Sequence, residues 1–118
     1  MIYHLTSRQA WSEAQGRGEY RAESLESEGF IHCSTETQIL PVANAFYRGQ
    51  QGTLLLAIDP SLLVSELRWE PPSGAPPPGV PEGDLFPHIY GPLNLDAIVN
   101  VYDLESHPDG SYKLPAFD

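Results

Sequence analysis

The uninterrupted apolar run Thr53–Ile58 (TLLLAI) most constrains the fold of this chain. A half-exposed strand alternates apolar and polar residues, whereas this run has no polar side chain after Thr53. We therefore expect a central strand that is buried on both faces. Further strands are expected at 2–6, 30–33, 64–70 and 86–90, and a closing hairpin at 98–104 and 112–114 around Asp109-Gly110.

Two helices are expected in the first half of the chain. Thr6 and Gln9 have the spacing of a capping box, which predicts a helix that begins there and ends near Gly18. Capping residues at the start of 34–47 predict a second helix over that range. The polar residues 19–28 between them favour a loop with a short helical turn. Two N-terminal helices and a run of strands indicate an α+β domain rather than β-α-β winding.

A proline-rich segment interrupts the second half of this chain. Seven of the twelve prolines and three glycines lie between Pro71 and Pro87, and proline cannot donate a hydrogen bond to a sheet. We expect 71–85 to form a long loop, either mobile or folded as a lid. The length of 118 residues otherwise predicts a single small domain, 1–118, that needs no disulfide for stability.

The charge balance excludes one class of partner. Sixteen acidic and six basic residues give a net charge of −10, with Lys113 as the only lysine. Because Lys and Arg contacts to phosphates dominate nucleic-acid affinity, we expect no extended nucleic-acid binding. The chain has no run long enough to span a membrane and no signal-peptide pattern, and the lone Cys33 is typical of a reducing compartment. We expect a cytoplasmic monomer whose partner is a small molecule.

Three histidines lie inside apolar runs that are expected to be strands: His4 in IYHL, His32 in GFIHCS and His88 in FPHIYG. A buried imidazole needs hydrogen-bond partners and changes charge near neutral pH. Since side chains alternate along a strand, each histidine shares its face with a hydroxyl-bearing residue two positions on. Those residues are Thr6, Ser34 and Tyr90. If the strands are neighbours, these groups form one ligand pocket; the alternative is three separate core histidines.

Other residues extend this candidate site. Glu70 ends a strand just before the proline-rich segment, where a carboxylate can act as a general base or accept a ribose hydroxyl; a solvated charge is the alternative. Cys33 points away from His32 on a regular strand, so we expect a buried hydrophobe rather than a nucleophile. The histidines lack the spacing of a metal site, and none is expected. The candidate ligand-binding residues are Tyr20, Ser24, Ser34, Thr35, Tyr90 and Gly91.

The blocks IYHL, EGFIHCST, FPHIYGPLN and DGSYKLP resemble a bacterial family named domain of unknown function 952, over nearly the whole chain. That family is similar in fold to the ADP-ribosyltransferases, which include the RNA 2′-phosphotransferases. In that group a first strand with a histidine and a split sheet hold the nicotinamide end of NAD. The resemblance therefore implies a split, mostly antiparallel sheet with His4 as the first-strand histidine and the His32 strand beside the same cleft.

These observations support competing hypotheses about function. The first is an enzyme that binds NAD or a similar nucleotide, with His4, His32 and His88 as catalytic residues and Glu70 stabilising an oxocarbenium-like charge. The second is a non-catalytic module that binds a small metabolite or a peptide in the same pocket. A hydrolase-like metal site is the third.

Overall fold

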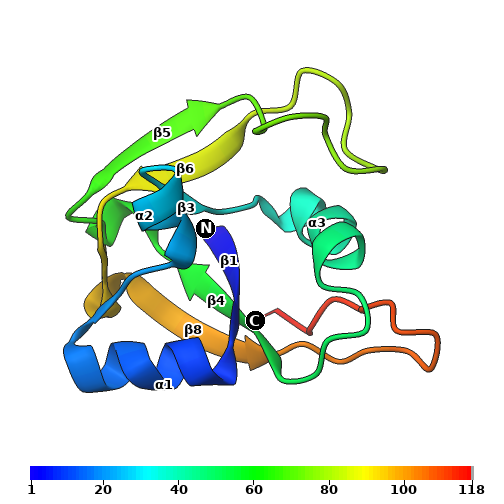
Figure 1. Cartoon of the computed structure of the whole chain (residues 1–118), viewed down its shortest axis with the longest axis horizontal. Helices are drawn as coiled ribbons and strands as arrows, with labels where there is room; N and C mark the ends of the chain where they lie inside the picture. The colour runs from blue at the N-terminus through cyan, green and yellow to red at the C-terminus, as the bar shows by residue number, and fades with distance from the viewer. Residues whose placement is uncertain (118) are drawn as a thin grey trace.

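The computed structural model describes residues 1–117 as three small sheets with three α-helices around them (Figure 1). The helices are α1 (Arg8–Arg17), α2 (Glu23–Ser27) and α3 (Ile39–Phe46), with short 3-10 turns η1 (Glu36–Gln38), η2 (Pro60–Leu62) and η3 (Leu95–Ala97). The strands are β1 (Ile2–Ser7), β2 (Glu19–Tyr20), β3 (Ile31–His32), β4 (Thr53–Ile58), β5 (Glu66–Glu70), β6 (Phe86–Tyr90), β7 (Leu93–Asn94) and β8 (Ile98–Asp103). Their ladders are antiparallel, which confirms a small α+β domain with mostly antiparallel sheets.

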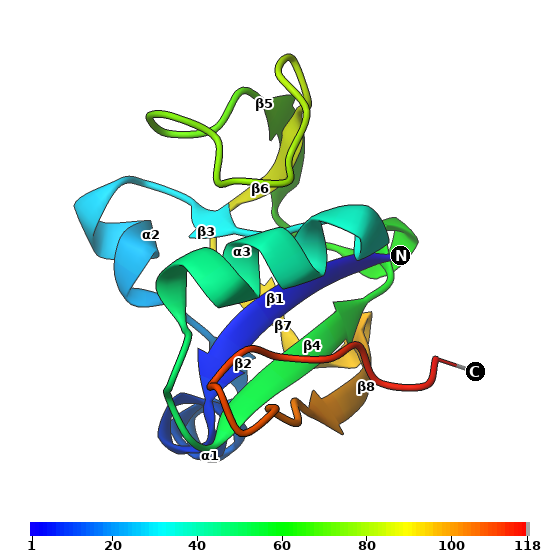
Figure 2. The same ribbon diagram turned by 90° about the vertical axis from the view of Figure 1, so that its right-hand side faces the viewer.

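The apolar run identified in the sequence forms β4, the middle strand of the sheet β1-β4-β8, and all of its residues are buried. One face of this sheet packs against α3, where Ile39 and Leu55 belong to one apolar cluster; Figure 2 shows α3 lying across β1. The opposite face contributes Leu56 to a second cluster with Ala14 of α1 and Ile31 of β3. Because both faces are covered, the expected central strand is confirmed.

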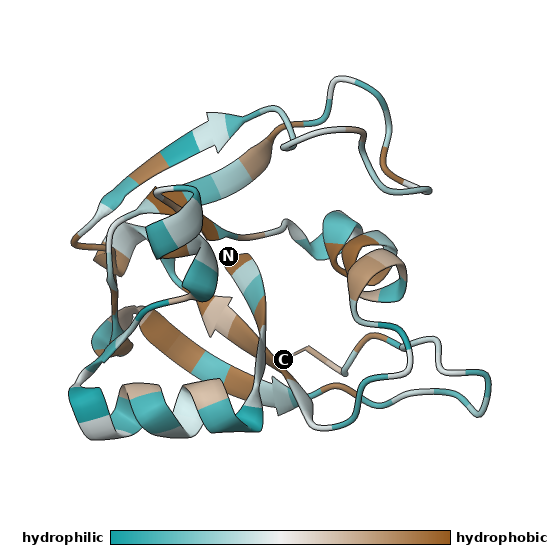
Figure 3. Ribbon diagram, in the orientation of Figure 1, coloured by the Kyte–Doolittle hydropathy of each residue, from teal (hydrophilic) through white to brown (hydrophobic). Residues whose placement is uncertain are grey.

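Helix α1 begins one residue later than the sequence predicts. Its N-cap is Ser7, whose Oγ accepts a hydrogen bond from the backbone N–H of Ala10 at 3.1 Å. Thr6 is instead a buried residue of β1, and its hydroxyl lies 2.9 Å from that of Tyr20. The prediction of Thr6 as the cap is wrong because a tertiary partner takes its side chain. The helix ends at Gly18 in the left-handed conformation (φ 90°) and is mostly hydrophilic (Figure 3).

The N-terminal half contains three helices rather than the expected two. Helix α2 forms where the sequence predicts only a helical turn. The capping side chains before α3 act as expected, because Thr35 and Gln38 form a capping box around η1. Pro41 lies in the first turn of α3, where a missing backbone N–H costs no hydrogen bond. No helix within residues 1–117 is both long and apolar enough to cross a bilayer.

An isolated bridge joins the two larger sheets. Tyr3 and Ser34 exchange two backbone hydrogen bonds of 2.8 Å each, which places the edge of β1 against the chain that leaves β3. Within the sheet β3-β6-β5, His32 lies directly opposite His88. The bridge therefore brings His4, the neighbour of Tyr3, close to the strand that carries His32.

The C-terminal hairpin is reduced to a turn. Ser106 and Tyr112 form a single bridge around Asp109-Gly110, and residues 112–114 do not form a strand. The Tyr112 hydroxyl donates to the carbonyl oxygen of Tyr47 at 2.6 Å, which anchors this segment to the loop after α3. The prediction of a second hairpin strand at 112–114 is therefore wrong. Tyr112 is held by contacts to the loop after α3 instead of by a regular ladder.

The proline-rich segment 71–85 lies beside α3 and contacts it at Pro41 (Figure 1). Val80 is buried, and the Gln38 side chain donates to the carbonyl oxygen of Leu85 at 3.0 Å. Gly79 lies beside α3, since a Cβ at this position would be in ordinary contact with Cγ of Pro41, at 3.4 Å. The segment therefore forms a wall that faces the end of β3 and the first strand.

Candidate functional site

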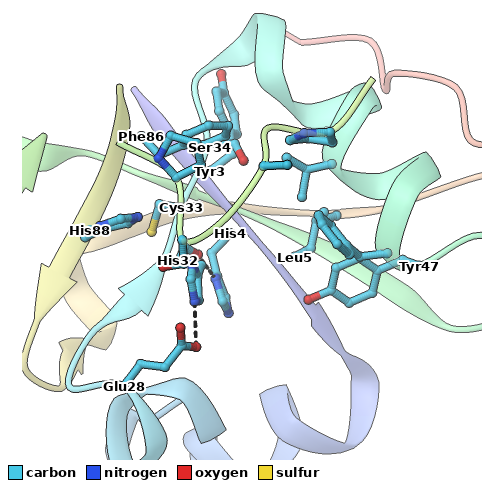
Figure 4. A pocket seen from close by; sticks show the side chains of 16 residues that line it. Tyr3, His4, Leu5, Glu28, His32, Cys33, Ser34, Tyr47, Phe86 and His88 are labelled. Carbon is cyan, nitrogen blue, oxygen red and sulfur yellow. Dashed lines mark hydrogen bonds and ion pairs between the residues drawn. The ribbon is translucent and has the colours of Figure 1, made fainter. Parts of the chain in front are cut away.

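A cavity of about 330 Å³ opens between β1, α3, the end of β3 and the proline-rich segment (Figure 4). The three histidines that the sequence predicts to share a pocket, His4, His32 and His88, all lie in its wall, with one carboxylate and mainly apolar neighbours. The lining residues are Tyr3, His4, Leu5, Glu28, His32, Cys33, Ser34, Val42, Phe46, Tyr47, Pro72, Ser73, Ala75, Pro77, Phe86 and His88.

His4 is buried, and both of its ring nitrogens have partners. Nδ1 lies 2.5 Å from the carbonyl oxygen of His32, so Nδ1 carries a hydrogen and donates it. Burial lowers the pKa of His4 to about 4, and the hydrogen bond to the His32 carbonyl only partly opposes this effect. His4 is therefore a neutral ring near pH 7 that fixes the backbone of β3 at His32.

Tyr20 supports the other side of the His4 ring. Its hydroxyl lies 2.7 Å from Nε2 of His4 and 2.9 Å from Oγ1 of Thr6. Since Nδ1 holds the hydrogen of the neutral His4 ring, Nε2 must accept, and Tyr20 donates to it. The same hydroxyl is within hydrogen-bond distance of Oγ1 of Thr6, so it joins the two side chains. Burial raises the pKa of Tyr20 to about 12, so this chain of three side chains carries no charge.

His32 lies on the open side of the cavity and pairs with a carboxylate. Its Nε2 donates to Oε2 of Glu28 at 2.8 Å, and both side chains are partly exposed (Figure 4). Glu28 is the C-cap of α2, and Gly29 follows it in the left-handed conformation (φ 90°). This tight turn folds the end of α2 back over β3, which brings Glu28 to His32 and to the cavity wall.

His88 lies deeper and is oriented by a second carboxylate. It is 2 % exposed, and its Nδ1 donates to Oε1 of Glu70 at 2.9 Å. Tyr90 donates to the same oxygen at 2.5 Å. The hydrogen bond from Tyr90, followed by that from His88, lowers the pKa of the Glu70 carboxyl. Because an ionised carboxylate only accepts, the hydrogen of a neutral His88 ring is on Nδ1 and a lone pair is left on Nε2.

Aromatic contacts fix the planes of His32 and His88. The two imidazole centroids are 5.4 Å apart and nearly perpendicular. Phe30 stacks on His88 at 4.1 Å and meets His32 edge to face at 4.7 Å. The guanidinium of Arg68 lies over the ring of Tyr90, 4.3 Å from its centroid. The two histidines therefore form a rigid pair on one face of the sheet β3-β6-β5.

A family model described as "Protein of unknown function (DUF952)" matches residues 5–101 of the chain. The chain belongs to the DUF952 family. The resemblance noted from the sequence blocks is thereby confirmed at the level of the family. Comparison of this DUF952 domain with the curated proteins found no significant match.

The DUF952 domain is similar in structure to protein CC0527 from Caulobacter crescentus. The crystal structure of CC0527 gives a TM-score of 0.81 at 32% identity, over 95% of this chain and 92% of CC0527. A double mutant of CC0527 gives 0.81 at 31% identity, over 95% and 92% of the two chains. The solution NMR structure of CC0527 gives 0.76 at 32% identity, over 93% and 89%. Nearly the whole domain thus shares its fold with CC0527.

Four residues that the sequence singled out lie at the cavity or one contact behind it. Ser34 is buried and lines the wall. Tyr20 is joined to the wall through His4, whereas Glu70 and Tyr90 are joined to it through His88. Glu70 is not one of the described residues that line the cavity. It therefore supports His88 from behind the cavity wall of the DUF952 domain.

Three other candidate residues have local structural contacts in the DUF952 domain. The Ser24 carbonyl closes the end of α2 by accepting from the backbone N–H groups of Glu28 and Gly29. Thr35 caps η1. A Cβ at Gly91 would lie 2.4 Å from Oγ of Ser65, so the glycine permits a close approach of two chain segments. None of the three belongs to the cavity wall formed by residues 1–117.

Sequence reasoning missed Glu28, the one carboxylate in the cavity wall. Its signal was its spacing of four residues before His32 across a glycine turn, which brings the two side chains together. The wall residues from α3 and from the proline-rich segment carry no such local signal, because tertiary packing alone places them.

Cys33 is a buried residue of the wall, and burial raises the pKa of its thiol. The thiol is therefore protonated at neutral pH, so it is not an activated nucleophile. Within residues 1–117 no group of three or more His, Cys, Asp or Glu side chains is arranged to hold a metal ion.

Proposed function

We propose that this DUF952 domain is an ADP-ribosyltransferase-like enzyme whose cavity binds the nicotinamide-ribose end of NAD. The observation that carries the proposal is the presence of His4, His32 and His88 in the wall of one largely apolar cavity. Its volume of about 330 Å³ lies near the lower end of the range of ligand pockets. A planar ring with its sugar therefore matches the cavity better than a whole dinucleotide does.

The proposed chemistry is cleavage of the bond between the ribose C1′ and the pyridinium nitrogen. The bonding electron pair leaves with nicotinamide, which becomes neutral, and positive charge develops on the ribose. A carboxylate beside the ribose stabilises this charge in the transition state. We assign this role to Glu28 rather than to Glu70, because Glu28 lines the cavity and Glu70 contacts His88 from outside the lining set.

His88 is the proposed general base. Glu70 accepts the Nδ1 hydrogen, which leaves the Nε2 lone pair of the neutral ring for an incoming hydroxyl group. As the hydroxyl oxygen bonds to C1′, its proton passes to Nε2, and the Glu70 carboxylate stabilises the resulting imidazolium. An acceptor that is a small alcohol or water is favoured over RNA, because the net charge of −10 repels a phosphate backbone.

The first experiment measures binding and turnover together. Calorimetry with NAD, nicotinamide and ADP-ribose tests the cavity, and release of nicotinamide from NAD tests the reaction. His88→Gln is expected to lower release by at least about 10²-fold, the lower end of the usual contribution of a general base, and Glu70→Gln by at least about tenfold. His107→Gln, in the exposed C-terminal turn, is the matched control and leaves release unchanged. No heat with any ligand at millimolar concentration refutes the proposal.

The second candidate function is a non-catalytic binding module with the same cavity. It is favoured by one observation: both carboxylates of the site are already paired with histidines, Glu28 with His32 and Glu70 with His88. A module binds the nicotinamide ring but releases none from NAD, and Glu70→Gln leaves its affinity unchanged. The same two assays therefore distinguish the enzyme from the module.

A further inference from the structure

The cavity wall contains a carboxylate and no fully charged cation. Glu28 is its one acidic residue, and no arginine or lysine of residues 1–117 lines it. Arg68 lies opposite His88 in the sheet register, yet its guanidinium lies over the Tyr90 ring and donates to Oε1 of Glu66 at 2.9 Å. Arg68, the cation opposite His88, therefore already interacts with Tyr90 and Glu66.

The other titratable groups of the wall do not offset this negative charge. Burial lowers the pKa of His4 to about 4, so this ring is neutral at physiological pH. Burial also raises the pKa of the Cys33 thiol, and desolvation, followed by the nearby Glu36 carboxylate, raises that of the Tyr3 hydroxyl, so both stay neutral. Burial raises the pKa of Tyr47 in the same way.

His32 and His88 are the two remaining ionisable groups of the wall, and each faces a carboxylate. His32 donates to Glu28, and His88 donates to Glu70, whose ionised form is favoured by the hydroxyl of Tyr90 and by His88 itself. Protonation of both rings would only balance the two carboxylates. With neutral rings, Glu28 is a negative charge in the wall of a low-dielectric cavity with no cation beside it in that wall, whereas the charge of Glu70, behind His88, is partly offset by Arg68.

We infer that the cavity selects its ligand by charge: it accepts a cationic pyridinium ring and rejects a ring that bears a carboxylate. This inference rests on the proposed function and names the form of its ligand. The oxidised nicotinamide of NAD is an N-alkylated pyridinium cation, whereas nicotinate is an anion of almost the same shape. A like charge brought next to Glu28 is repelled, and removal of its water makes the repulsion larger.

The test uses three ligands of matched shape and different charge. Nicotinamide, its N1-methylated cation and nicotinate are titrated calorimetrically into the protein at about pH 8, above the ordinary pKa of histidine. The cation is expected to bind at least about tenfold more tightly than nicotinate, which corresponds to about 1.4 kcal/mol, with nicotinamide between them.

A matched pair of variants locates the selectivity. Glu28→Gln keeps a hydrogen-bonding side chain beside His32 and is expected to reduce the difference between cation and anion at least about threefold. Glu13→Gln removes a carboxylate from α1, outside the cavity wall, and is expected to leave the difference unchanged.

Two outcomes overturn the inference in distinguishable ways. If nicotinate binds as tightly as the cation, or more tightly, charge selection is refuted while ring binding in the cavity stands. If none of the three ligands binds, the proposed function is refuted, and the inference falls with it.

Discussion

Replacement of Tyr20 by Phe tests the buried hydrogen-bonded chain that positions His4. The ring of Tyr20 is buried, and its hydroxyl lies 2.7 Å from Nε2 of His4 and 2.9 Å from Oγ1 of Thr6. The change removes one oxygen and leaves Nε2 without a partner. An unsatisfied buried group costs about 1–3 kcal/mol, and the hydroxyl serves two groups. We expect the free energy of unfolding to fall by about 2–3 kcal/mol.

Urea unfolding measures this cost. With an m-value of about 1.5 kcal/mol/M, the midpoint is expected to fall by about 1.3–2 M while the slope stays constant. Tyr102→Phe is the matched control: its hydroxyl accepts from the exposed Asn100 side chain at 3.0 Å, so its removal costs less than about 0.5 kcal/mol. Equal midpoints for the two variants would refute the account of His4.

A double variant shows whether the three side chains act together. Thr6→Val removes the hydroxyl at the far end of the chain from His4. If Thr6 acts through Tyr20, the cost of the double variant is smaller than the sum of the two single costs by at least about 0.5 kcal/mol. Additive costs would mean that Thr6 and Tyr20 contribute independently.

Three further predictions concern other parts of the domain. Because the pKa of His4 is lowered to about 4 in the folded state, its contribution to stability is present above about pH 6.5 and is lost as the pH falls toward 4. NMR of the His4 ring is expected to show a neutral imidazole at about pH 5.5. A titration midpoint at or above about pH 6.5 would contradict this prediction. Leu56→Ala in the middle of β4 is expected to lower the free energy of unfolding, measured in urea, by about 2–5 kcal/mol. Leu62→Ala, at an exposed position, is expected to lower it much less. Equal losses would contradict the central place of β4. Gly91→Ala places a Cβ 2.4 Å from Oγ of Ser65 and is expected to lower the free energy of unfolding by at least about 1 kcal/mol. Adding Ser65→Ala to this variant should recover part of that loss. No recovery would show that another contact is responsible.

Most strands can be predicted from the sequence because the order of apolar and polar residues along a strand is a local signal. The apolar run of β4 is covered on both faces, and β1, β5, β6 and β8 form close to their expected positions. The failures came from side chains whose partners are distant in sequence. Thr6 could not be recognised as a partner of Tyr20, and Tyr112 could not be recognised as a partner of Tyr47, so a cap and a hairpin strand were misassigned.

The candidate site was predictable in its histidines but not in its walls. Imidazoles inside apolar runs indicate burial, and strand alternation gave each histidine its face. The bridge between Tyr3 and Ser34 brings β1 to the chain that leaves β3, so that the three histidines line one cavity, and this bridge has no local signal in the sequence. The apolar wall depends on the packing of α3 and segment 71–85, which tertiary structure alone determines.

The central claim is that the cavity walled by His4, His32 and His88 binds the nicotinamide end of NAD. The most direct measurement is an NMR titration of the isotope-labelled protein with NAD that follows the imidazole signals of its four histidines. The account predicts that the His32 and His88 signals shift with one common saturation curve, while His107, exposed in the C-terminal turn, does not respond. Unchanged His32 and His88 signals at millimolar NAD, or an equal response of His107, would contradict it.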